Sequence, residues 1–386
     1  MGISLVLLLS AVSFVSLKGS RVLMTLFAVD LGAGPFETGM LFAVYGLVPF
    51  LFVVSAGRLA DRFGNRALMY AGFAGFACAL TLPALLPTLP VLFVASPLIG
   101  LTSMVFIVAL QNLVGVLSAP EDRTRNYSWY SLTDSGGAVV GPVLVGFLID
   151  GYGHPATYYV LAGIAAACLV MFHARRGVLP AGAGSGERAK AGPAADLLRL
   201  PALRNALLTN GIVMSGVDLY LVYFPVYTRG IGIPASEIGV MMGAFGVAGF
   251  LVRALIPPIT ARWGVHGMIA GALVIACAAF VAIPLTDNRW LLGAVSFLVG
   301  LGLGCGQPLS MLLSFNAAPP GRSAEAVAMR MAVSYGSHVV IPPVFGALGA
   351  VTGLAPVFWT CAMLMGGGAV LNRKGVVQRG GMRDEG

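Results

Sequence analysis

The sequence has 386 residues, of which 58% are hydrophobic and only 10% are charged, against roughly 25% charged residues in a soluble globular domain. This composition excludes an ordinary soluble protein and predicts a membrane protein. The net charge of +8 is explained by where Lys and Arg fall between the apolar segments, so it gives no reason to expect a nucleic-acid partner.

Apolar stretches of about 20 residues, each long enough to cross a hydrocarbon core of about 30 Å, follow one another along the chain. The sequence therefore predicts an all-α membrane protein with twelve transmembrane helices. They are expected at residues 3–30, 36–57, 66–87, 89–117, 126–150, 155–173, 204–228, 236–257, 266–286, 289–316, 324–350 and 354–372.

Basic residues are distributed unequally between the connections. Of the 23 Lys and Arg, 17 lie in alternate loops and in the C-terminal tail, whereas only Arg229 and Arg289 lie in the opposite loops. Because basic loops stay on the cytoplasmic side, we expect both termini in the cytoplasm. The predicted location is the cytoplasmic (inner) membrane, which the chain crosses many times.

The composition changes in the middle of the chain. Residues 175–204 are rich in Gly, Ala and Pro with interspersed basic residues, which is typical of a flexible linker. The predicted organisation is a six-helix bundle over 1–174, a cytoplasmic linker over 175–203, a second six-helix bundle over 204–373 and a cytoplasmic tail over 374–386.

The two halves resemble each other when the sequence is shifted by 200 residues. Residues 32–146 then align without a gap, and seven glycine pairs coincide, where about two would coincide by chance. An internal repeat of six spans gives both copies the same membrane orientation. We therefore predict two pseudo-symmetric bundles.

A charged stretch, GRLADRFGNR at residues 57–66, interrupts the apolar sequence, and the second half carries a partial copy that keeps Arg262 and Gly264. The stretch resembles the loop signature of the major facilitator superfamily, roughly G-x-L-x-D-R-x-G-x-[RK]. The resemblance implies a cytoplasmic gate latch whose carboxylate caps a helix end and pairs with Arg. The alternative is a basic anchor that only fixes topology. The residues concerned are Gly57, Arg58, Asp61, Arg62, Gly64, Arg66, Arg262 and Gly264.

A second resemblance lies in the fifth predicted span. Gly137, Gly141, Pro142 and Gly146 are similar to the pattern G-x-x-x-G-P-x-x-G-G of exporters and antiporters of this family, with Val145 in place of one glycine. Small residues four apart allow helices to approach closely, and proline bends the helix. Tight packing alone is the alternative. The arginine that such exporters often carry four residues before Gly100 is absent, which weakens an assignment as drug–proton antiporter.

Charged residues inside the apolar spans point to a solute pathway, because a charge at bilayer depth is costly and usually faces a cavity or a partner. Lys18 and Arg21 share a helix face, and the 200-residue shift pairs Lys18 with Asp218. We expect Lys18 and Asp218 to face one aqueous passage and to form an ion pair that changes during transport. A static pair that sets helix register is the alternative.

Other polar residues complete the predicted site. Asp134 and His338 are candidates for carrying a proton. Of the two, His338 has a side chain type that changes charge near neutral pH. Together with Lys18 and Arg21, Arg330 gives the passage an excess of positive charge, which favours an anionic solute. Neutral hydrogen bonds to the solute, or contacts between helices, are expected from Gln111, Asn112, Tyr130 and Gln307.

No phosphate-binding glycine loop, catalytic triad or metal-ligand spacing stands out in the sequence, so we expect no enzyme activity and no cofactor. The predicted function is secondary transport by alternating access: proton-coupled export of a small organic solute by a monomer that contacts lipids and protons. Two alternatives stay open, namely proton-coupled uptake of a carboxylate and a non-transporting receptor or scaffold on the same fold.

Overall fold

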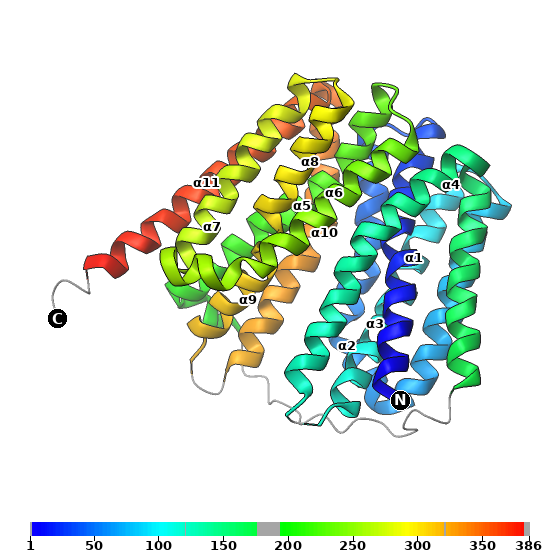
Figure 1. The fold of residues 1–386 in the computed structure, drawn as a ribbon, viewed down its shortest axis with the longest axis horizontal. Coiled ribbons are helices and arrows are strands. Elements are labelled where there is room, and N and C mark those ends of the chain that lie inside the picture. The colour runs from blue at the N-terminus through cyan, green and yellow to red at the C-terminus, as the bar shows by residue number, and fades with distance from the viewer. Residues whose placement is uncertain (1, 120, 176–193, 320–321, 382–386) are drawn as a thin grey trace. The chain divides into compact units, whose positions relative to one another are not determined.

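A computed structural model describes residues 2–119, 121–175, 194–319 and 322–381, while the side chains of 53–63 and of a few further helical residues fall outside the description. The described residues are helical apart from short turns (Figure 1). The longer helices of the first half are α1 (Gly2–Asp30), α2 (Pro35–Leu85), α3 (Leu89–Leu117) and α4 (Arg123–Ala174). The later ones are α5 (Pro201–Gly230), α6 (Ala235–Ala254), α7 (Ile256–Ala282), α8 (Arg289–Gly304), α9 (Gly306–Ala317), α10 (Ser323–Thr352) and α11 (Leu354–Gly381).

Eleven helical stretches in the described part of the chain are long and apolar enough to cross a membrane. This finding confirms a multi-pass, all-helical membrane protein. The part of the chain that the structure describes also contains the 3₁₀ helices Ala194–Arg199 and Ile283–Leu285. Helix α11 continues through Gly381, so the predicted tail after residue 373 begins as helix.

Among the described residues, six glycines have positive φ, and they form three pairs separated by 200 residues: Gly32 with Gly232, Gly64 with Gly264, and Gly153 with Gly353. Only glycine adopts this backbone conformation without strain. The first two pairs lie within the predicted repeat, and the third extends it past residue 146. The kinks at Gly64 and Gly153 divide the 51-residue α2 and the 52-residue α4 near the junctions of the predicted spans.

The hairpins after α1 and α5 are built in the same way. The amides of Gly32 and Ala33 donate to the carbonyls of Val29 and Ala28, and those of Gly232 and Ile233 donate to Arg229 and Thr228. Both patterns are the Schellman motif, in which a glycine just past the helix satisfies the last carbonyls. The repeat is therefore present in local hydrogen bonding as well as in sequence.

Prolines explain two helix breaks that the predicted spans missed. Pro257 and Pro258 lack an amide proton. The helix is interrupted just before them, at Leu255, between α6 and α7. Pro308 likewise leaves the carbonyl of Gly304 without its helical donor, and α8 ends at that residue. Nε of Arg253 donates to this carbonyl at 3.3 Å, so Arg253 satisfies the broken helix instead of extending toward lipid headgroups.

The chain forms two compact units: residues 1–187 with 225–243, and residues 188–224 with 244–386. In the first unit α1 packs along α4, and α2 along α3. In the second unit α7 packs along α11 and α8. The hairpin segment 225–243 follows the predicted linker in sequence but belongs to the first unit, whereas the predicted boundaries at 174 and 204 stay predictions.

Candidate functional site

The first half of α4 presents three different faces. Tyr130, Gly137 and Gly141 lie on the face that packs against α1. An exposed apolar stripe at spacings of three, eight and seven contains Trp129, Leu132, Val140 and Phe147. The third face is polar or small and holds Ser131, Asp134 and Ala138, of which Ser131 is exposed. An apolar stripe suits lipid, and a second accessible stripe with a carboxylate suits water.

Close packing of α1 on α4 depends on the glycines of the exporter-like pattern. A Cβ at Gly137 would lie 2.7 Å from Cβ of Phe14, and one at Gly141 would lie 2.7 Å from the Gly19 amide nitrogen. Gly146 touches the backbone of Ala235, and the carbonyl of Pro142 faces Gly239. At these four positions of α4 neighbouring helices approach closely.

Lys18 forms an ion pair with Asp134, Nζ to Oδ1 at 2.8 Å, with about a third of each side chain exposed. Lys18 lies about 24 Å along α1 at 1.5 Å per residue, near the middle of this 29-residue helix. Within its own unit each of the two residues has another partner, Lys18 with Asp134 and Asp218 with His338, so the expected Lys18–Asp218 ion pair stays a prediction. The repeat identifies equivalent positions, whereas contacts follow from helix packing.

Removing this ion pair is expected to cost little stability because both groups are partly exposed. Lys18→Met and Asp134→Asn should each lower the thermal unfolding temperature in detergent. The double variant should lose less than the two single losses combined, with a coupling of up to about 1 kcal/mol. Strictly additive losses would show that the two side chains do not interact in the folded protein.

Arg21 lies one turn beyond Lys18 and places its guanidinium 4.9 Å from the ring centroid of Tyr45 and 5.9 Å from that of Phe42. This is a cation–π arrangement. The ring of Tyr130 meets Phe14 edge-on at 5.5 Å. Arg21 is thus held by aromatic faces of α2 in the first unit.

The amide candidates of α3 mainly hold helices together. Nδ2 of Asn112 donates to Oδ1 of Asn65 at 3.0 Å, so this side chain links α3 to α2. The backbone carbonyl of Gln111 accepts from the Tyr127 hydroxyl at 3.2 Å. The side chain of Gln111 is exposed. For Asn112 the interhelical alternative therefore describes the geometry.

In the second unit, Asp218 of α5 is fully buried and pairs with His338 of α10, Oδ1 to Nδ1 at 2.6 Å. By helical rise Asp218 lies about 26 Å along α5 and His338 about 23 Å along α10, near the middle of both 30-residue helices. Tyr335 meets the imidazole edge-on at 6.0 Å. Two candidates chosen separately from the sequence thus form one dyad.

Arg330 is held by a residue that the sequence analysis missed. Buried Asn210 accepts from Nη1 of Arg330 at 3.2 Å and from the Ser310 hydroxyl at 3.0 Å. Its own amide donates to the hydroxyl of Ser334 at 3.0 Å. Asn210 therefore joins α5, α9 and α10, and its position inside an apolar span was the one available signal.

Gln307 lies close after the helix break and directs Nε2 to the sulfur of Met214 at 3.4 Å. The glycines that precede it each meet another helix: Gly302 approaches α7, and Gly304 approaches Gly249 of α6. Gly302 and Gly304 therefore allow close packing of α8 against neighbouring helices, and α8 ends directly after them, before Cys305.

The cytoplasmic latch predicted from GRLADRFGNR is described only at its end. Gly57, Arg58, Asp61 and Arg62 lie outside the residues whose side chains the structure describes. Gly64 and its repeat partner Gly264 both have positive φ and interrupt α2 and α7. The need for a positive φ at this point explains why the partial copy in the second half keeps Gly264. Of the arginines of the two copies, Arg66 is half-buried and Arg262 is exposed.

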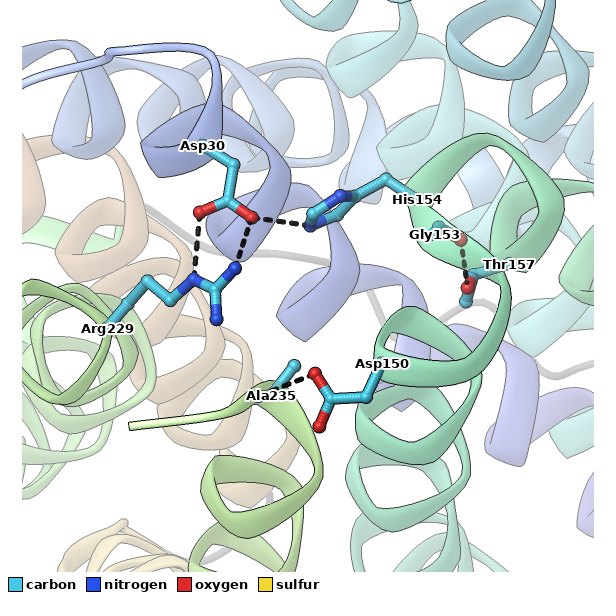
Figure 2. A network of polar contacts seen from close by, with 7 residues as sticks. All are labelled: Asp30, Asp150, Gly153, His154, Thr157, Arg229 and Ala235. Atoms are coloured by element: carbon cyan, nitrogen blue, oxygen red, sulfur yellow. Dashed lines mark hydrogen bonds and ion pairs between the residues drawn. The ribbon is translucent and has the colours of Figure 1, made fainter. Parts of the chain in front are cut away.

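A charged cluster that the sequence analysis did not assemble lies in the first unit, at the hairpins after α1 and α5 (Figure 2). Arg229 donates from Nε and Nη2 to the two oxygens of Asp30, both at 2.8 Å. Asp150 accepts from the amides of Ala235 at 3.1 Å and Ser236 at 2.8 Å. Loop charges at helix ends are normally solvated, so nothing in the sequence indicated this cluster.

Comparison with known proteins places these features in a family. The family model described as "Major Facilitator Superfamily" matches residues 6–337. The "Efflux pump azaK" of Aspergillus niger is 24% identical over 363 residues, covering 86% of this chain and 77% of that protein. The class C tetracycline resistance protein of Escherichia coli is 26% identical over 292 residues, covering 72% and 71%.

Solved structures share the fold. The nucleoside transporter NupG superimposes with a TM-score of 0.81 at 13% identity, covering 97% of this chain and 99% of that one. The peptide transporter POT in complex with sulfate gives 0.81 at 16% identity, covering 98% and 94%. The chain therefore belongs to the major facilitator superfamily, and it is a membrane transporter rather than an enzyme.

Proposed function

We propose that this protein exports a small organic solute, with a preference for anions, in exchange for protons. It does so by alternating access of two six-helix bundles around a site at mid-membrane depth. The efflux pump and the tetracycline resistance protein among its relatives support export. The chain works as a monomer whose partners are the solute, protons and lipids.

Twelve crossings follow if α2 and α4 each count as two spans on either side of Gly64 and Gly153, and if α8 with α9 counts as one. A 52-residue helix would be about 78 Å long, far more than a bilayer core of about 30 Å. An even number of crossings leaves both termini on one side. The basic loops then place this side in the cytoplasm, and the membrane is the cytoplasmic one.

The observation that carries proton coupling is the Asp218–His338 dyad, a fully buried carboxylate bonded to a titratable ring. A buried carboxylate is stable as an anion only while a partner compensates it. Moving the imidazole when α10 moves would therefore change the protonation of the pair. This linkage lets a proton gradient drive the conformational cycle.

Solute recognition is assigned to the Lys18–Asp134 pair and its surroundings. An anionic group that approaches Lys18 competes with Asp134 for the same ammonium. Arg21 adds positive charge one turn away on the same helix face. Ion-pair exchange of this kind would couple binding of an anion to release of α4 from α1 at that level.

Everted membrane vesicles test the direction of transport. Vesicles containing the protein and energised by respiration should accumulate an added probe, either tetracycline or an aromatic carboxylate, and should release protons measured with a pH-sensitive dye. Vesicles from cells lacking the protein are the control. Accumulation only in right-side-out vesicles would replace export with uptake, and no solute movement in either orientation would indicate a receptor or scaffold.

A further inference from the structure

Arg330 of α10 carries a positive charge that its neighbours in the second unit do not compensate. Its Nη1 donates to the oxygen of Asn210, which is a neutral amide, and its Nε is buried without a hydrogen-bond partner. Among the residues that the structure describes, no carboxylate pairs with this guanidinium. Because arginine stays charged in proteins, an anion is the group that would compensate it.

The carboxylates of the surrounding helices are bound elsewhere. Helices α5, α9 and α10 meet at Arg330 and contain two acidic residues, Asp218 and Glu325. Glu325 accepts from Nε of Arg322 at 2.9 Å. Asp218 pairs with His338, which follows Arg330 by eight residues and so lies about 12 Å further along α10. Neither carboxylate is available to the guanidinium.

The first unit shows that this fold does not need an arginine here. Tyr130 is the equivalent of Arg330 after the 200-residue shift, and its ring packs edge-on against Phe14. An aromatic side chain therefore fills the same position without placing a charge in the unit. A cation inside a membrane span is costly and usually serves a function, so the structure of the second unit points to a ligand.

Asn210 fixes the position of the guanidinium without neutralising it. The side chain is fully buried and lies about 14 Å along the 30-residue α5. Its oxygen accepts from Arg330 and from the Ser310 hydroxyl. Its nitrogen donates to the Ser334 hydroxyl and to the backbone carbonyl of Arg330. Two donors and two acceptors fully use an asparagine amide, so Asn210 holds one orientation.

We infer that Arg330, positioned by Asn210, binds the carboxylate of the transported solute. Arg330 is only half-buried, and its unpaired Nε lies on the same edge as Nη2, the edge that Arg229 presents to Asp30. This edge matches a carboxylate, and a single positive charge matches a monoanion. The inference rests on the proposed function and adds a recognition point in the second unit to the one assigned to Lys18 in the first.

Binding of benzoate to the purified full chain in detergent tests the inference, with the neutral benzamide as the reference compound. Benzoate should raise the unfolding temperature of the parent more than benzamide does. Arg330→Gln removes the positive charge, whereas Asn210→Asp supplies an internal carboxylate that compensates it. Both variants should bind benzoate at least about tenfold more weakly than the parent, as expected from losing one charge-assisted hydrogen bond.

Two controls separate a binding site from a structural role. Arg204→Gln removes an exposed arginine of the same unit and should bind benzoate like the parent. In the absence of benzoate, Arg330→Gln should unfold at the parent's temperature or above it, because it removes an uncompensated charge, whereas loss of a structural arginine would lower that temperature.

Unchanged benzoate binding by Arg330→Gln and Asn210→Asp, or equal stabilisation of the parent by benzoate and benzamide, would overturn the inference. Loss of binding in Lys18→Met alone would also overturn it, while leaving anion export as proposed. Since binding is measured in detergent and export in vesicles, failure of one result is distinguishable from failure of the other.

Discussion

Replacing Asp218 with asparagine is expected to abolish proton-driven accumulation of solute while leaving exchange of solute across the membrane intact. Asparagine keeps the shape and a hydrogen-bond acceptor for His338, so the buried contact at 2.6 Å can persist. The asparagine side chain, unlike a carboxylate, cannot take up or release a proton near neutral pH. The variant therefore loses the group that carries the proton and retains the fold.

The measurement compares two assays on the same everted vesicles: accumulation under a proton gradient, and exchange of labelled for unlabelled solute without one. Asp196→Asn is the matched control, since it removes an exposed carboxylate from the same unit outside the spans. His338→Gln should weaken accumulation by the same route. Full accumulation by the Asp218 variant would remove the dyad from the coupling mechanism.

A methyl group at Gly137 is expected to destabilise the protein, whereas one at the neighbouring Gly136 is not. The Cβ at position 137 would lie 2.7 Å from Cβ and 2.8 Å from the backbone carbon of Phe14, while nothing lies within 4 Å of a Cβ at position 136. Overpacking of this kind costs about 1–3 kcal/mol. Alanine in an open helical position gains up to about 1 kcal/mol over glycine.

Thermal unfolding of the two purified variants measures this contrast, together with the fraction of each that elutes as a single species in detergent. Gly137→Ala should unfold at a lower temperature than the parent, and Gly136→Ala at an equal or higher one. The substitutions are chemically identical and adjacent in one helix, so equal behaviour would mean that α1 and α4 are not packed as closely as described.

The repeat was the part of the fold that sequence predicted best, for a reason visible at its glycines. Gly32, Gly64 and their partners 200 residues later need positive φ, and few residues other than glycine tolerate it. A backbone requirement therefore preserved the pattern while side chains around it changed. The pair Gly153 and Gly353 lay outside the aligned region because the flanking sequences differ.

The partners of the buried charges could not be read from the sequence. The shift by 200 residues related Lys18 to Asp218, but Lys18 meets Asp134 and Asp218 meets His338. Equivalent positions in a repeat share an environment, whereas ion pairs depend on which helices lie side by side. That arrangement is set by glycine contacts such as Gly141, which the pattern identified without naming the opposing helix.

The contacts of charged residues near helix ends also could not be predicted from the sequence. Asp30 and Asp150 fall at the boundaries of predicted spans, where a solvated carboxylate is the usual interpretation. Their roles arise only when the hairpin after α5 folds into the first unit, which brings Arg229 and the start of α6 to them. Such long-range placement leaves no local signal in the sequence.

The account as a whole depends on a water-filled pathway along the polar face of α4. Cysteines placed at Ser131, Ala138, Leu132 and Val140, in an active variant without native cysteines, test it in lipid membranes with a charged, membrane-impermeant thiol reagent. Because only a hydrated thiolate reacts, positions 131 and 138 should label at least about tenfold faster than 132 and 140, and added solute should slow them. Equal labelling of both stripes, or faster labelling of 132 and 140, would contradict a polar pathway on this face of α4.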